Sequence, residues 1–298
     1  MDVWAHDRWR IPLPAGHKFP IDKYRLLRER VQDSVTVHES EAVPWEWLAE
    51  VHEADLLERI RTGTMTLREI RGLGLPWSEV LVERGRRSVG GTVAAARRAV
   101  EHGIGMNLGG GTHHAGRDFA RGYCLFNDVV VTLARLRSEG AVQRALVVDC
   151  DVHQGDGTAQ LLRPDRDAFT LSLHGARNYP FERIPSDLDV DLPSGTGDDE
   201  YLRVLSESLD VALDAGVPDI AFFLAGADPW EGDRLGRLAL TKAGLRARDE
   251  LVLDRLLETG APVVVVLAGG YAPDVVDTVD INAATVAAVA ARDTARLS

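Results

Sequence analysis

Short apolar runs recur along the last two-thirds of the chain, and each is rich in Val, Ile, Leu or Phe. Successive positions within a run are apolar, so a strand formed there would be buried on both faces. That pattern is typical of a parallel sheet covered by helices on both sides. The predicted strands are Ile104–Leu108, Ala145–Asp149, Phe169–Leu173, Ile220–Ala225 and Pro262–Ala268.

Between these runs, apolar residues recur at three- and four-residue spacing, which predicts amphipathic helices. The predicted helices are Val89–Val100, Asp128–Ser138, Asp198–Leu213 and Lys242–Leu257. Strand–helix alternation predicts an α/β fold with a mostly parallel, doubly wound sheet. We expect one domain over residues 1–298, with 1–90 as a mostly helical rim and 91–298 as the core sheet.

The conspicuous polar residues follow the predicted strands. In open α/β sheets, ligands bind beyond the carboxyl ends of the strands. Gly109 to His114 follow the first strand, Asp149 ends the second, Asp228 follows the fourth and Tyr271 follows the last. The sequence therefore predicts one functional edge.

Asp149, Asp151 and His153 alternate at the end of a buried strand, where residues two apart face the same side. Unpaired charges there would be costly, and a divalent cation would offset that cost. The alternative is that these residues cap neighbouring helices. Because Asp228 ends another strand, we favour a catalytic metal site with three protein ligands, Asp151, His153 and Asp228, and one open position.

Two adjacent histidines, His113 and His114, follow three glycines on a predicted loop. Such a pair suits proton transfer near neutral pH if carboxylates orient the rings. Asp149 and Asp156 are the candidate partners. Tyr271 could donate a hydrogen bond to a developing oxyanion. Buried structural histidines and a core tyrosine are the alternatives.

The formal net charge of −12 disfavours nucleic acid as a partner and would favour the approach of cationic substrates. The two cysteines, Cys124 and Cys150, lie in apolar surroundings and are predicted to be buried thiols. We find neither a signal peptide nor an apolar run long enough to span a membrane. A cytoplasmic protein without a membrane partner is expected.

Four segments together resemble the zinc-dependent histone deacetylase family of the arginase/deacetylase superfamily. They are Asp149–Gly157, Gly109–Ala115, Gly122–Asp128 and Ala268–Tyr271. Gln154, which follows His153, and the segment around Asp228 are similar to class IV and its bacterial relatives. The resemblance implies an arginase/deacetylase fold with about eight mostly parallel strands flanked by helices.

The resemblance also implies a role for each matching residue. Asp151, His153 and Asp228 would bind zinc, with iron possible in the cell. His113, His114, Asp149, Asp156 and Tyr271 would be catalytic, and Gly122 and Tyr123 would line a substrate tunnel. A structural potassium ion could lie at Asp149, Asp151, His153, Ser172 and Leu173. The related arginases need two further aspartates where this chain has Gly155 and Trp230, which argues against a second metal ion.

The expected activity is hydrolysis of the amide of an acetyl- or acyl-lysine peptide or protein. An amidohydrolase of acetylated polyamines or other small acyl-amines would share every catalytic residue. A deacylase for long acyl chains is a third candidate, and a non-catalytic acyl-lysine reader is an alternative of another class. The sequence leaves open the physiological substrate, the oligomeric state, the native metal and which histidine is the general base.

Overall fold

In the computed structural model, which describes residues 1–297, eight strands form one sheet in the order β2-β1-β3-β8-β7-β4-β5-β6. Every ladder in this sheet is parallel, which confirms the predicted sheet type. The strands are β1 (Asp2–Ala5), β2 (Thr36–Glu39), β3 (Ile104–Asn107), β4 (Ala145–Asp149), β5 (Ala168–Gly175), β6 (Leu188–Leu192), β7 (Ile220–Leu224) and β8 (Val263–Val266).

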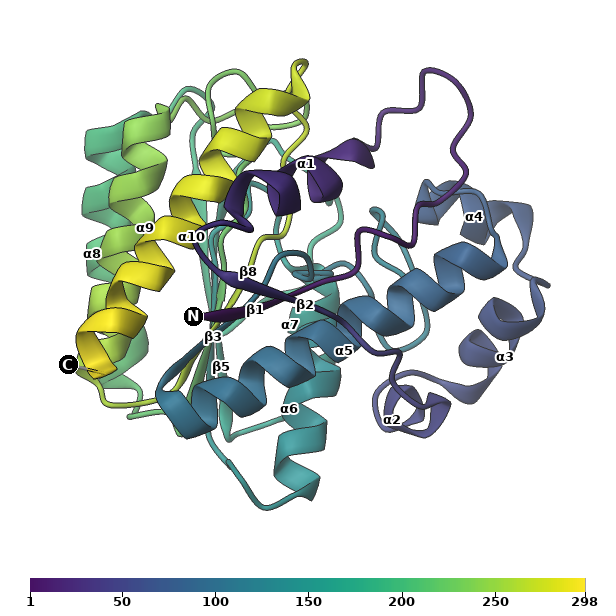
Figure 1. Cartoon of the computed structure of the whole chain (residues 1–298), viewed down its shortest axis with the longest axis horizontal. Coiled ribbons are helices and arrows are strands. Elements are labelled where there is room, and N and C mark those ends of the chain that lie inside the picture. The colour runs from purple at the N-terminus through teal and green to yellow at the C-terminus, as the bar shows by residue number, and fades with distance from the viewer. Residues whose placement is uncertain (298) are drawn as a thin grey trace.

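Helices cover both faces of the sheet (Figure 1). They are α1 (Asp22–Val31), α2 (Trp45–Ala49), α3 (Ala54–Thr62), α4 (Leu67–Leu73), α5 (Glu79–His102), α6 (Asp128–Ser138), α7 (Asp156–Leu162), α8 (Asp198–Asp214), α9 (Lys242–Glu258) and α10 (Val275–Leu297). Helices α1, α8, α9 and α10 pack on one face, and α2 to α7 lie on the other. Within residues 1–297, no helix combines the length and apolarity that a membrane crossing requires.

Strands β7 and β8 lie at the centre of the sheet and are fully buried. Their side chains alternate between the two apolar layers: Phe223 and Val265 join one core cluster, and Phe222 and Val264 join the other. This double burial explains why both strands read as continuous apolar runs. Cys124 and Cys150 are buried free thiols, as predicted.

The five predicted strands are present, but three others were not predicted. Strands β1 and β2 come from the first ninety residues, so this segment is not only a helical rim: it also forms one edge of the sheet. Strand β6 forms the opposite edge, and both edge strands carry polar residues, Thr-Val-His-Glu in β2 and Leu-Asp-Val-Asp-Leu in β6. An edge strand needs no continuous apolar run, so a search for doubly buried strands overlooks it.

Parallel pairing brings the carboxyl ends of β3, β8, β7, β4 and β5 to one edge in that spatial order. The loops after four of these strands bear the histidine pair, Tyr271, Asp228 and the Asp151–His153 segment. Residues more than 150 positions apart in the sequence are thereby collected into one place.

Candidate active site

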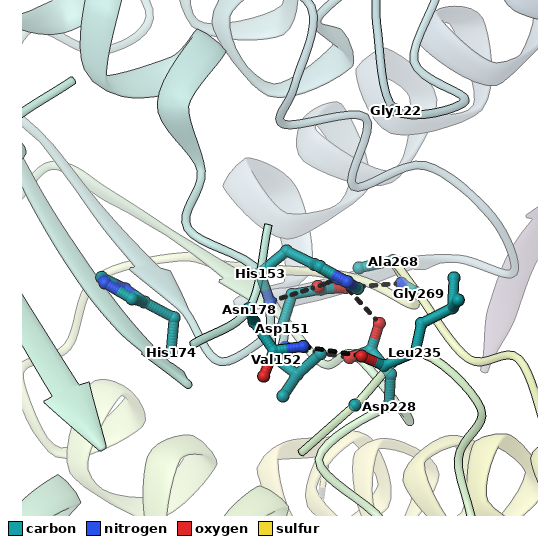
Figure 2. A network of polar contacts seen from close by, with 12 residues as sticks. Gly122, Asp151, Val152, His153, His174, Asn178, Asp228, Leu235, Ala268 and Gly269 are labelled. Carbon is teal, nitrogen blue, oxygen red and sulfur yellow. Dashed lines mark hydrogen bonds and ion pairs between the residues drawn. The ribbon is translucent and has the colours of Figure 1, made fainter. Parts of the chain in front are cut away.

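Asp151, His153 and Asp228 converge beyond β4 and β7 (Figure 2). Each offers one ligand atom, these atoms all lie within 4.8 Å of one another, and all three residues are buried. His153 Nδ1 lies 2.9 Å from Asp151 Oδ1 and 3.4 Å from Asp228 Oδ2. The remaining oxygens are held by backbone: Val152 N–H donates to Asp228 Oδ1 at 2.9 Å, and Gly269 N–H donates to Asp151 Oδ2 at 2.7 Å.

This donor set fits a divalent metal ion. Asp228 Oδ2 is buried and makes no hydrogen bond within residues 1–297. Burial and the charge of Asp151 raise the pKa of Asp228 to about 7, so a second carboxylate charge is unfavourable there without a cation. A Cβ at Gly269 would lie 1.9 Å from Asp228 Oδ2, so only glycine allows the backbone to approach both carboxylates. Imidazole nitrogen and carboxylate oxygen are both ligands that zinc takes in proteins.

Each histidine of the His113–His114 pair is oriented by its own carboxylate. His113 Nδ1 lies 2.6 Å from Asp149 Oδ2, and His114 Nδ1 lies 2.5 Å from Asp156 Oδ1. The two rings are 4.1 Å apart, and the His114 ring is 5.8 Å from that of His153. All these carboxylates are buried, so each ring is fixed in orientation with Nε2 as its remaining nitrogen.

The two histidines differ in electrostatic surroundings. Burial opposes protonation of His113, but the charges of Asp149 and Asp151 outweigh burial and raise its pKa to about 9. For His114, burial and the neighbouring cationic charge of His113 hold the pKa well below its ordinary value. In this arrangement His114 is the neutral member of the pair.

Tyr271 follows β8 and lines the same cavity, with its ring 6.4 Å from that of His153. Its backbone N–H donates to Asp233 Oδ2 at 2.6 Å, which fixes the residue at the cavity wall. Burial raises the pKa of the Tyr271 phenol well above its ordinary value. The hydroxyl therefore stays protonated at neutral pH and can donate a hydrogen bond.

The cavity has a volume of about 410 Å³, and Gly122 and Tyr123 form part of its wall. Tyr123 has a φ of +67°, a left-handed conformation that a bulky residue adopts only where the surroundings enforce it. A Cβ at Gly122 would lie 2.5 Å from His114 Cδ2, so the glycine lets the chain pass directly against the His114 ring. Gly122 and Tyr123 line this cavity, and their role in a substrate tunnel stays a prediction.

The residues predicted to hold a monovalent cation lie at or just beyond the end of β4 and within β5. Ser172 lies directly opposite Asp149 in the β4–β5 ladder, and Leu173 is fully buried beside it. The Ser172 hydroxyl is paired with His174 Nδ1 at 2.9 Å. A potassium site there stays a prediction.

Two arginines of the site were not predicted. Arg121 forms an ion pair with Asp156, the carboxylate that also orients His114. Arg248 is fully buried and donates to the carbonyl oxygens of Gly226 and Cys150, which adjoin the segments bearing Asp228 and Asp151. Arg248 shares a helix face with Leu245 and Val252, so a charged residue on an apolar stripe was the available signal.

A buried histidine supports the scaffold of this site. His52 Nδ1 donates to Gly116 O at 2.7 Å, and its Nε2 accepts the N–H of Asn127 at 3.1 Å. Asn127 caps α6, whose first residue Asp128 accepts the N–H groups of Gly111 and Thr112 in the histidine loop. The His52 ring must therefore be neutral to hold the segment that begins α6.

Acidification from pH 7 to pH 5 should cost the wild type about 2 kcal/mol more stability than it costs His52→Gln. Burial lowers the pKa of His52 from 6.5 to about 4. The unfolded state therefore binds the proton first, and this contribution to stability is lost as the pH falls below 6.5. Urea unfolding at both pH values measures the difference, and equal losses for the two proteins would contradict it.

Known proteins resemble this chain in sequence and in fold. The Histone deacetylase domain family matches residues 17–287. An uncharacterized protein of Picosynechococcus sp. is 42% identical over 282 residues, which span 93% of this chain and 94% of that protein. Histone deacetylase 2 of Arabidopsis thaliana is 36% identical over 189 residues, covering 62% of this chain and about half, 49%, of the plant protein.

A solved structure of similar fold is the HDA15 HD domain, with a TM-score of 0.80 at 22% identity. The superposition covers 99% of this chain and 91% of that one. At this level of identity the likeness concerns the fold alone, and it extends over the whole sheet and its flanking helices.

Proposed function

Because this chain belongs to the histone deacetylase family, we propose that it is a metal-dependent deacylase acting on the amide of an acetyl- or acyl-lysine-type substrate. The observation that most supports this is the meeting of a buried Asp-His-Asp cluster, a carboxylate-paired histidine pair and a tyrosine hydroxyl at one cavity. We propose that the whole chain forms one catalytic domain, in which these residues have the roles described below.

Asp151, His153 and Asp228 are the residues that would hold the ion, and their donor atoms favour zinc, with iron as the alternative. When bound, such an ion polarises an amide carbonyl and lowers the pKa of water. Two carboxylate ligands offset most of its charge. A separate general base is therefore needed, and the chain offers one nearby.

We assign that base to His114. Its Nδ1 is held by Asp156, which leaves Nε2 to take a proton from the attacking water. The Tyr271 hydroxyl then donates a hydrogen bond to the carbonyl oxygen as negative charge develops on it. A protonated histidine returns the proton to the leaving amine, and His113, whose pKa is raised by Asp149, is suited to share that step.

Gly122 and Tyr123 are assigned to the wall of the tunnel that admits the acylated side chain. Asn178 and Tyr179 also line the cavity, and the Tyr179 ring meets that of His114 edge-on at 4.9 Å. Gln154 and the Asp228 segment are the basis on which we place the chain near class IV. This placement makes long acyl groups worth testing alongside acetyl.

One panel of substrates tests the proposal. Metal-loaded protein should release acid from an acetyl-lysine peptide, and a chelator should abolish the release because the ion supplies essential chemistry. A long-acyl peptide and an acetylated polyamine complete the panel and separate the candidate activities. Tight binding of the acyl-lysine peptide by the metal-loaded protein without any turnover would instead favour an acyl-lysine reader.

A further inference from the structure

Three exposed arginines line the mouth of the cavity. Arg71 lies in the last turn of α4, Arg177 lies two residues before Tyr179, and Arg237 follows the segment after Asp228. All three are exposed to solvent, in contrast to Lys23 and Arg84, which line the cavity from buried positions. The entrance therefore carries positive charge contributed by three separate segments.

These arginines lack partners, which sets them apart from most others in the chain. Within residues 1–297 none of the three makes a side-chain hydrogen bond or an ion pair, whereas most of the remaining arginines are ion-paired. Their guanidinium groups are thus free to meet a ligand.

Among the residues that line the cavity within 1–297, Asp151 is the one acidic residue, and it is buried beside His153 rather than exposed with the arginines. Asp233 lies close in sequence to Arg237, but it does not line the cavity and accepts the backbone N–H groups of Leu235, Gly236 and Tyr271.

The arginine-bearing segments are tied to the walls of the site. The carbonyl of Gly72, next to Arg71, accepts the N–H of Gly122 at 3.0 Å. Asn178, next to Arg177, donates from Nδ2 to Leu235 O at 2.7 Å, which links its segment to the one that bears Arg237. The backbone positions of the three charges are therefore fixed relative to the cavity.

The local charge opposes that of the whole protein. A net charge of −12 spread over the surface is screened within about 8 Å at physiological salt, so a ligand at the mouth responds mainly to the nearest groups. Lining charges of one sign focus the field at a cleft and concentrate ligands of the opposite sign. Guanidinium groups match carboxylates in geometry as well as in charge.

We propose that the substrate carries carboxylate groups on the amine side of the scissile amide, where they meet Arg71, Arg177 and Arg237. This inference rests on the proposed deacylase function and narrows its substrate class. Acidic residues flanking an acyl-lysine and the free α-carboxylate of a small acylated amino acid share this chemistry. Acetylated polyamines and strongly basic peptide tails are disfavoured, because their positive charges would lie against three guanidinium groups.

Matched substrates provide the test. Acetyl-lysine peptides with Glu, Gln or Arg on both flanks should rank in that order, with kcat/KM for the Glu peptide at least about tenfold above that for the Arg peptide at low salt. The preference should shrink at 1 M salt, where charges are screened within about 3 Å. Nε-acetyl-lysine with a free or an amidated α-carboxyl group separates a small-molecule source of the carboxylate from a peptide source.

Substitutions of the three arginines test whether they cause the preference among the Glu, Gln and Arg peptides. The Arg71→Gln, Arg177→Gln, Arg237→Gln triple variant should bring the Glu-to-Arg preference close to one. The control replaces Arg68, Arg163 and Arg166 with Gln; these are also exposed arginines without ion pairs, but they do not line the cavity. The control changes the net charge equally and should keep the wild-type preference.

The possible results distinguish failure of this inference from failure of the proposed deacylase function. Hydrolysis of the Gln peptide without a preference for Glu, or a preference that survives in the triple variant, overturns the inference and leaves the deacylase intact. If no peptide is hydrolysed, the deacylase proposal fails. Fluorescence anisotropy with the same three labelled peptides then still ranks them by affinity, and equal affinities would overturn the inference as well.

Discussion

Asp228→Ala should abolish metal binding in the Asp151–His153–Asp228 cluster and reduce hydrolysis to background. The variant loses one of three ligands and half of the carboxylate charge that stabilises a divalent cation. Metal affinity should fall by more than roughly 10²-fold, the upper range for loss of an outer-shell partner. Equilibrium dialysis followed by metal analysis measures this directly and does not depend on turnover.

Asp228→Asn isolates the charge, because the amide oxygen can still accept the N–H of Val152 that Asp228 Oδ1 accepts. In chelator at pH 7 this variant should be at least as stable as the wild type. Burial and Asp151 raise the pKa of Asp228, so its ionisation costs folding free energy above the unfolded pKa, and Asn removes that cost.

Bound metal should make the wild type more stable than Asp228→Asn. At an ion concentration 100 times Kd, the wild type gains about 2.7 kcal/mol of stability, and the variant should gain little. Urea unfolding with and without zinc supplies the readout. A variant protein that retains one tightly bound ion per chain and full activity would remove Asp228 from the ligand set.

The Asp151–His153–Asp228 cluster could be predicted from the sequence because its residues lie at strand ends. Asp151 and His153 follow the buried strand β4, Asp228 follows β7, and in the structure these two strands pair in parallel, so that their carboxyl ends lie side by side. The two His–Asp pairs followed from the same reasoning, since β3 and β4 end at one edge. The order of the strands in the sheet thus determines where the loop residues that directly follow each strand lie.

Other features depend on contacts that no local pattern encodes. Strands β1 and β2 are short and partly polar; β1 joins the sheet by pairing with β3, and β2 joins it by pairing with β1. Arg248 lies on a helix and reaches the carbonyls of two other segments, a contact set by how α9 packs. The arginines at the cavity mouth come from helix α4 and two loops far apart in the sequence, so the total charge does not reveal the positive charge at the entrance.

The positive charge at the cavity mouth changes how the net charge of the protein is interpreted. A net charge of −12 predicts attraction of cationic substrates only if the charges are spread evenly over the surface. Within residues 1–297 most arginines are ion-paired with acidic side chains, whereas Arg71, Arg177 and Arg237 are unpaired and line the cavity. The electrostatic field at the site is determined mainly by those few groups. For this reason the net charge of the whole chain predicts cationic substrates, whereas the arginines at the cavity mouth indicate anionic ones.

Tyr271→Phe should fold and bind metal as the wild type does, yet lose roughly 10²-fold or more in kcat with little change in KM. The change removes one oxygen that lies in the cavity wall and contributes no metal ligand. Its hydrogen bond gains most in the transition state, where the carbonyl oxygen is negatively charged, so the loss should fall on kcat rather than on binding.

Tyr201→Phe is the matched control, because it also removes one phenolic hydroxyl, but from a fully buried residue of α8 that does not line the cavity. This control should keep wild-type kcat. Steady-state kinetics on one acetyl-lysine peptide, with metal content and unfolding midpoint measured for both variants, separates a lost oxyanion donor from a damaged fold. If Tyr271→Phe turned over within a few-fold of the wild type, the charge developing on the carbonyl oxygen would have to be stabilised without the phenol, and the ion with its three ligands would be the remaining source of that stabilisation.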